Sequence, residues 1–184
     1  IVYGFLEDRA AGERAKAILD ACYAPMLSED IPLVVANLPT AELVKVAANA
    51  FLATKISFIN AMSQVCDAAG ANVTALAEAI GMDNRIGHRF LRAGIGFGGG
   101  CLPKDIRAFQ ARANELGVGD ALAFLADVDK VNDTMRAGVI RTVRELLGDR
   151  LAEATVTVLG AAFKPDSDVT VMTVGEVILA PTML

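Results

Sequence analysis

The sequence predicts a mostly α-helical fold built around one long central helix, with a short α/β segment at each end. Three observations carry this prediction. The 184-residue chain is 54% hydrophobic but only 5% aromatic, which favours an aliphatic core. Apolar residues recur at helical spacing over long stretches of the chain. Short β-prone runs occur only toward the two ends, at residues 1–3, 31–36 and 155–159.

Charge and cysteine content exclude several classes of function. The chain has 22 acidic and 17 basic side chains, and the basic residues are scattered, so we expect no nucleic-acid partner. The three cysteines lack metal-ligand spacing, and their odd number and wide separation suggest reduced thiols, no metal site and a cytoplasmic protein. The longest apolar stretch, residues 43–59, contains Lys45, Asn49 and Lys55, so we expect no membrane span. We expect no signal peptide at the start of the chain.

The first elements predict the end of an α/β domain over residues 1–36. A strand at 1–3 precedes a helical pattern at 8–23, which Pro25 is expected to stop. The β-prone run at 31–36 follows. Thr40 then suits the N-cap of the long central helix, predicted over residues 41–69.

The helix at 41–69 is apolar nearly all round in its first half, which predicts burial on most sides. A chain of this size offers little to cover so long a helix, so we expect it to form a homodimer interface. Lys45 and Asn49 are four residues apart and share a face of this helix. They are a candidate polar site, although Lys45 alone would more simply extend its ammonium to the surface.

The remaining elements predict a helical domain over residues 37–150. Asn72 is expected to cap a short helix that ends at Ile80. Another helix is expected to start at Asp83 or Asn84 and to carry His88 and three arginines on its surface. A helix is predicted at 103–116, and residues 121–147 are predicted to form another long helix or two joined helices. The strand at 155–159 and the polar turn after it predict the start of a second α/β domain at 151–184.

A glycine-rich stretch, GIGFGGGCLPKD at residues 94–105, is the strongest candidate for chemistry. Glycine at this density exposes backbone N–H groups to a ligand. Pro103 suits the first turn of a helix, which places Cys101 at a helix N-terminus, where the dipole favours the nucleophilic thiolate. Asp105 falls on the same side one turn later. The plainer alternative is a buried cysteine after an ordinary loop.

Three blocks of sequence resemble the UDP-glucose/GDP-mannose dehydrogenase family. They are AELVKVAANAFLATKISFIN at 41–60, GMDNRIGHRFLRAGIGFGGGCLPKD at 81–105 and VLGAAFKPDSD at 158–168. The middle block is most similar to the UDP-glucose branch. The resemblance implies a helical dimerisation domain with a long central helix, flanked by remnants of α/β Rossmann-like domains. Residues 1–36 would end an NAD-binding domain, and 151–184 would begin a nucleotide-sugar-binding domain.

The resemblance also implies a reaction, the NAD-dependent, two-step oxidation of UDP-glucose to UDP-glucuronate. Cys101 would carry the intermediate as a thiohemiacetal and then a thioester. Lys45 and Asn49 would stabilise the oxyanion and hold the hydrolytic water, and Asp105 would act as the base. No dinucleotide fingerprint lies between a strand and a helix here, so the chain alone is expected to be inactive, with NAD bound mainly elsewhere.

The resemblance assigns further residues to ligand binding. Arg85 would reach into the partner subunit's site, and Lys104 would contact the cofactor. The expected substrate-binding residues are Arg85, Phe90, Leu91, Gly94, Phe97, Gly98, Gly99, Phe163 and Lys164. Gly100 stands where the family usually has serine, Ala61 stands where glutamate commonly follows the asparagine, and the segment after Asp168 departs from the family pattern. Two alternatives stay open, a single-step hydroxyacid dehydrogenase of the 6-phosphogluconate type and a non-catalytic dimerisation module.

Overall fold

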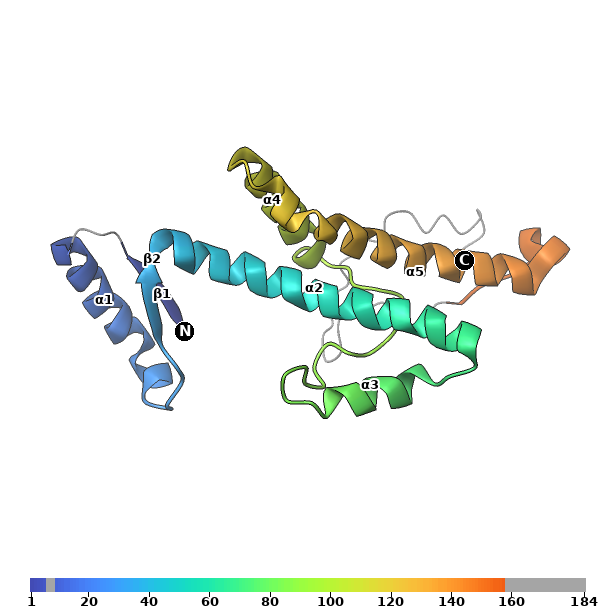
Figure 1. Ribbon diagram of the computed structural model, residues 1–184, viewed down its shortest axis with the longest axis horizontal. Helices are drawn as coiled ribbons and strands as arrows, with labels where there is room; N and C mark the ends of the chain where they lie inside the picture. The colour runs from blue at the N-terminus through green and yellow to red at the C-terminus, as the bar shows by residue number, and fades with distance from the viewer. Residues whose placement is uncertain (6–8, 158–184) are drawn as a thin grey trace. The chain divides into compact units, whose positions relative to one another are not determined.

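A computed structural model of the chain describes residues 1–5 and 9–157. Five α-helices, two short 3-10 helices and one pair of strands account for the regular structure in these residues (Figure 1). The chain divides into two compact units, residues 1–48 and 49–184. The predicted mostly helical fold class is confirmed.

The first unit contains a parallel β–α–β arrangement. Strand β1 (Val2–Phe5) pairs in parallel with β2 (Val34–Asn37), in the register Val2 to Val34, and helix α1 (Arg9–Leu27) connects them. A helical crossover is the usual way to join parallel neighbours. The prediction that Pro25 stops α1 is wrong, because the helix continues to Leu27. Proline lacks only its own N–H, and the N–H of Ser28 still bonds to Ala24 O at 3.0 Å.

Helix α2 (Leu38–Ala69) is the long central helix that the sequence predicts. It begins earlier than expected, because Asn37 rather than Thr40 supplies the cap. The side-chain oxygen of Asn37 accepts the N–H of Thr40 at 3.0 Å. The helix ends as predicted before Gly70, whose φ of 68° allows the N–H of Ala71 to reach Cys66 O at 2.8 Å.

The segment between α2 and the glycine loop is helical only in its first part. Helix α3 (Val73–Gly81) starts after Asn72, whose side chain accepts the N–H groups of Thr74 and Ala75, so the predicted cap is confirmed. The helix expected from Asp83 is absent, and residues 82–93 form turns. Gly87 and Phe90 have positive φ values of 70° and 64°, which interrupt a right-handed helix.

The last described elements follow the predicted order. They are α4 (Leu102–Glu115), the 3-10 helix η1 (Gly119–Leu122), α5 (Phe124–Leu147) and the 3-10 helix η2 (Gly148–Ala152). The beginning of the predicted helix at 121–147 lies partly in η1. Residues 155–157 of the predicted strand form no strand, and its last two residues lie outside the described part of the chain.

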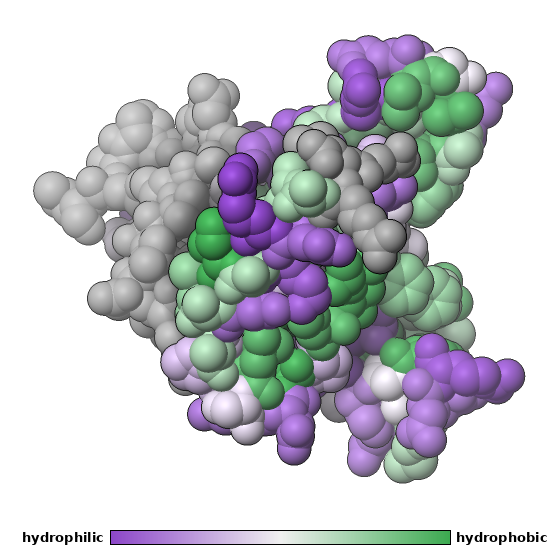
Figure 2. All heavy atoms as spheres, turned by 90° about the vertical axis from the view of Figure 1, so that its left-hand side faces the viewer, coloured by the Kyte–Doolittle hydropathy of each residue, from purple (hydrophilic) through white to green (hydrophobic). Residues whose placement is uncertain are grey.

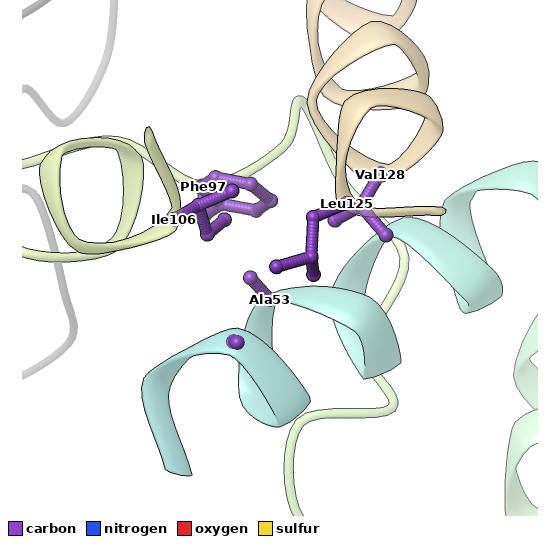
Figure 3. Packing of buried hydrophobic residues seen from close by; sticks show 6 residues of the cluster. Ala53, Phe97, Ile106, Leu125 and Val128 are labelled. Carbon is purple, nitrogen blue, oxygen red and sulfur yellow. The ribbon is translucent and has the colours of Figure 1, made fainter. Parts of the chain in front are cut away.

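The core of the second unit forms where α2, the glycine loop, α4 and α5 meet. Figure 3 shows Ala53 of α2, Phe97 of the loop, Ile106 of α4 and both Leu125 and Val128 of α5 packed together. The Ser57 hydroxyl of α2 donates to Val128 O of α5 at 2.7 Å and joins these two helices. This cluster therefore fixes the glycine loop and the start of α4 against α2.

Truncating Ile106 tests the importance of this core. Its side chain is fully buried, so Ile106→Ala is expected to lower the free energy of unfolding by about 2–5 kcal/mol. Leu116→Ala removes as much apolar side chain from a residue that is 60% exposed, and its effect should stay within about 0.5 kcal/mol. Urea denaturation of both variants measures the difference. Equal losses would contradict the assignment of the core.

Apolar residues also reach the surface. Figure 2 shows hydrophobic side chains exposed among hydrophilic ones on the face it presents. On α2, Phe51, Phe58 and Val65 are 65%, 50% and 57% exposed and follow one another at seven-residue intervals. They form a row of exposed apolar side chains along one side of the helix, the apolar stripe, in which Thr54 and Lys55 lie between Phe51 and Phe58. Within the described residues, no helix is long and apolar enough to cross a bilayer.

Candidate functional site

Cys101 lies where the sequence predicts, at the N-terminus of a helix. It is the N-cap residue of α4, its side chain is exposed, and its sulfur makes no capping hydrogen bond. Pro103 occupies the first turn, where a missing N–H costs nothing. The thiol of Cys101 is therefore accessible at the positive end of a helix dipole.

Asp105 lies one turn beyond Cys101, and its N–H donates to Cys101 O at 2.9 Å. Its side chain is 14% exposed and receives a hydrogen bond from Asn49 Nδ2 at 2.6 Å. Lys104 Nζ lies 3.2 Å from the other carboxylate oxygen. Asn49, which is 5% exposed, thus joins α2 to the first turn of α4 and fixes the orientation of the carboxylate.

Lys45 lies on α2 one turn before Asn49, as its spacing predicts. Its side chain is exposed. Lys45 belongs to the first compact unit and Asn49 to the second. Its role toward a reacting group stays a prediction.

Two buried asparagines hold the glycine loop. Asn60 of α2 is fully buried and accepts the N–H of Gly94 at 2.9 Å. Asn132 of α5 is 1% exposed, accepts the N–H of Phe97 at 2.7 Å and donates to its carbonyl at 3.0 Å. The guanidinium of Arg136 donates to the same carbonyl at 2.6 Å. The loop is thus attached to a different helix at each end of residues 94–97.

Sequence reasoning missed Asn132 and Arg136. A signal for Asn132 was present, because Leu125, Val128 and Asn132 recur at helical spacing on the buried side of α5. A polar residue at the third position of an apolar stripe indicates a buried hydrogen bond. Its partner on the loop cannot be read from α5 alone.

The aromatic and aliphatic ligand candidates lie in different surroundings. The ring of Phe97 is 6% exposed and packs in the core, and its assignment to the substrate site stays a prediction. Phe90 is 44% exposed. Leu91 is 5% exposed and lines a groove of about 600 Å³ with residues of α3. Gly98 and Gly99 follow Phe97 in the loop, and Phe163 and Lys164 lie outside the described residues.

The charged ligand candidates are exposed. Arg85 donates to both carboxylate oxygens of Asp83, the shortest contact being 2.6 Å, and these hydrogen bonds hold the pKa of Asp83 below its usual value. The same hydrogen bonds raise the pKa of Arg85. The side chains of Arg85 and Lys104 are 88% and 73% exposed.

The glycine loop does not fit a dinucleotide. Its GIGFGG pattern resembles a dinucleotide fingerprint, but the loop follows turns, and neither the expected helix nor a strand precedes it. The N–H groups of Gly94 and Phe97 are already bonded to asparagine side chains. They are therefore not available to a pyrophosphate.

Comparison with known proteins agrees with this arrangement. Residues 39–134, more than half of the chain, match the central domain of the UDP-glucose/GDP-mannose dehydrogenase family. The chain belongs to this family. Its match includes α2, the glycine loop, α4 and the first part of α5, so the resemblance noted in the sequence is confirmed.

Two curated relatives of this family member are UDP-glucose 6-dehydrogenases. The chain is 40% identical over 159 residues to UDP-glucose 6-dehydrogenase TuaD of Bacillus subtilis (strain 168), which covers 86% of this chain and 33% of that protein. It is 38% identical over 156 residues to a UDP-glucose 6-dehydrogenase of Rickettsia typhi, covering 85% and 36%. The chain spans about a third of the length of these relatives.

A solved structure supports the fold of this family member. The UDP-glucose dehydrogenase of the hyperthermophilic archaeon Pyrobaculum islandicum superposes with a TM-score of 0.71 and is 38% identical. The superposition covers 80% of this chain and 32% of that one.

Proposed function

We propose that this chain is the central part of an NAD-dependent UDP-glucose 6-dehydrogenase, active as a cytoplasmic homodimer on a UDP-sugar. One observation carries the proposal: an accessible cysteine at the N-terminus of α4, with a carboxylate one turn later that α2 orients through Asn49. Membership of the family supports the same assignment. The domain boundaries at 36 and 150 are part of the proposal. The three free thiols agree with a cytoplasmic location.

Cys101 acts as the nucleophile in this proposal. Its thiolate attacks the aldehyde carbon and forms a C–S bond, and after oxidation the sugar is held as a thioester. Water then attacks the carbonyl, the C–S bond breaks, and the thiolate leaves with the electron pair. NAD supplies the oxidising capacity when it is bound. The residues of this chain hold and release the sugar.

Asp105 accepts the proton from the attacking water in this scheme. Asn49 orients the carboxylate by its hydrogen bond at 2.6 Å, and Lys45 stabilises the oxyanion that forms on the sugar. The main chain of Gly98 and Gly99, together with Phe90 and Leu91, contributes to the substrate site. In this proposal Arg85 acts in the partner subunit's site, and Phe163 and Lys164 bind the nucleotide.

The yield of NADH tests the reaction. The full-length protein that carries this sequence is expected to form two NADH for each UDP-glucose consumed, because an alcohol becomes a carboxylate in two oxidations. Absorbance at the NADH band, with product analysis by mass, gives the ratio. A ratio of one with no carboxylate would favour the single-step hydroxyacid type. No NADH from UDP-glucose would refute the proposed reaction.

The apolar stripe on α2 supports the homodimer. Phe51 and Phe58 each expose half or more of their surface and lie seven positions apart on α2, with Val65 seven positions further along. A second copy of the same stripe is the proposed occupant, because a two-fold axis brings identical faces together.

Charged substitutions in the stripe test the dimer. Sedimentation is expected to show a dimer at micromolar concentration, and Phe51→Glu with Phe58→Glu should convert it to a monomer, because the dimer would bury two unpaired carboxylates per chain. Leu146→Glu, at a residue of α5 that is 72% exposed, is the matched control and should leave the dimer intact. A wild-type monomer would refute the interface, as would a double variant that still dimerises.

A further inference from the structure

We infer that Asn132, on α5, is a positioning residue for Cys101, acting through the main chain of Phe97. This inference rests on the proposed function, because it assigns Asn132 to the arrangement of that same site. No residue of α5 was expected to act there.

The side chain of Asn132 uses both ends of its amide on one residue of the glycine loop. Oδ1 accepts the N–H of Phe97 at 2.7 Å, and Nδ2 donates to its carbonyl at 3.0 Å. Arg136, one turn later on α5, donates to the same carbonyl at 2.6 Å. Because Asn132 is 1% exposed, water cannot readily replace these hydrogen bonds. The peptide groups of Phe97 are therefore fixed relative to α5.

Gly96 is matched to Asn132. A Cβ atom built on Gly96 would lie 2.3 Å from Asn132 Oδ1, and the φ of Gly96 is 102°. A side chain at position 96 would be strained by its backbone conformation and would also push the amide of Asn132 away. The close approach of α5 to the loop therefore depends on both residues together.

The position of Phe97 is transmitted to Cys101 through a short and packed connection. The ring of Phe97 lies in the core beside Ile106 of α4, as Figure 3 shows. Cys101 is the N-cap of the same helix and follows Phe97 by four residues. The loop is thus fixed at Phe97 by α5 and at its end by α4. A change at Asn132 is expected to move the glycines and the sulfur together relative to the substrate.

A purely structural asparagine would satisfy the Phe97 peptide and affect only stability. The two roles differ in kinetics. A misplaced nucleophile lowers kcat even in molecules that are folded, because small displacements of reacting groups cost rate. A residue that only stabilises the fold changes the fraction of folded protein and leaves kcat per folded molecule unchanged.

Three variants of the full-length protein test the inference. Asn132→Leu removes both hydrogen bonds at nearly constant volume, and Gly96→Ala disturbs the same contact while keeping Asn132. Asn72→Ala is the control, because it removes the cap of α3 and lowers stability without touching the loop. Amide hydrogen exchange at Phe97, melting temperature, and kcat and KM for UDP-glucose are measured for each.

We expect Asn132→Leu and Gly96→Ala to speed exchange at Phe97 by roughly tenfold or more under native conditions. Both should lower kcat roughly tenfold to a hundredfold per folded molecule, with KM changed much less. Asn72→Ala should leave both quantities at the wild-type value. If Asn132→Leu does not fold, Gly96→Ala decides the question.

Two outcomes would overturn the inference. Unchanged exchange at Phe97 would refute the hydrogen bonds themselves. Faster exchange with unchanged kcat would make Asn132 a structural residue only. A wild-type protein that forms no NADH would instead refute the proposed function, while the exchange measurement would still show whether Asn132 holds the loop. The two failures are therefore distinguishable.

Discussion

Replacing Cys101 with serine is expected to lower the formation of UDP-glucuronate by roughly 10³-fold or more, the scale on which removal of a nucleophile acts. A serine hydroxyl is a far weaker nucleophile than a thiolate, so oxidation should stop at the aldehyde level. Stability should not fall, because Cys101 is exposed at the N-cap of α4 and serine is a favoured N-cap residue. Loss of carboxylate with an unchanged melting temperature would thus locate the effect in the chemistry.

Product analysis by mass after a fixed number of turnovers measures this effect in the full-length protein. Cys22→Ser is the matched control, since Cys22 is also an exposed free thiol but lies on α1. It should retain wild-type activity. A Cys101→Ser protein that makes UDP-glucuronate at the wild-type rate would refute the nucleophile assignment.

Replacing Asp105 with asparagine should lower kcat by roughly 10² to 10⁴, the range for loss of a general base. The amide oxygen of the new side chain can still accept from Asn49 Nδ2, which lies 2.6 Å from the carboxylate in the native chain. The variant also loses the ion pair with Lys104. This pair contributes little to stability, because the Lys104 side chain is 73% exposed. Asp105→Asn should therefore keep its stability while losing activity.

Comparison with Asp129→Asn controls for the loss of a negative charge. Asp129 lies on α5, is paired with Arg107 at 3.1 Å and has a similarly covered side chain, 20% exposed. Single-turnover kinetics should show slow release of the thioester in Asp105→Asn and a normal rate in Asp129→Asn. Equal rates of hydrolysis in the two variants would remove Asp105 from the role of base.

Local chemistry made much of the fold predictable. Asn72 before an apolar repeat identified the start of α3, and Pro103 placed the start of α4 to within one residue. The predicted helix boundaries were wrong where a second residue could cap the helix or where the backbone adopted a positive φ. Asn37 took the cap of α2 in place of Thr40, and the helix predicted from Asp83 is interrupted by the positive φ values in its sequence. A positive φ is uncommon for a bulky residue such as Phe90, so the sequence gives no signal for it.

The candidate site was predictable where its residues are neighbours in sequence. Cys101 and Asp105 are one turn apart on α4, and their relation follows from helical spacing alone. The hydrogen bond between Asn49 and Asp105 joins residues 56 positions apart, and the contact of Asn132 with Phe97 spans 35. Such contacts depend on how helices pack, which spacing within one helix does not specify. The burial of Phe97 was missed for the same reason.

The two halves of the glycine loop differ in how readily they can accept a side chain. At Gly96 a new side chain would meet Asn132, so this position and Asn132 should tolerate change only in concert. At Gly100 a built Cβ meets nothing within 4 Å, and at Gly98 it meets only Arg136, at 4.0 Å. Natural variation in sugar preference should therefore accumulate at positions 98 and 100, ahead of Cys101, while the φ of 78° at Gly99 restricts the position between them. Efforts to retarget the family to other nucleotide sugars have their most permissive positions there.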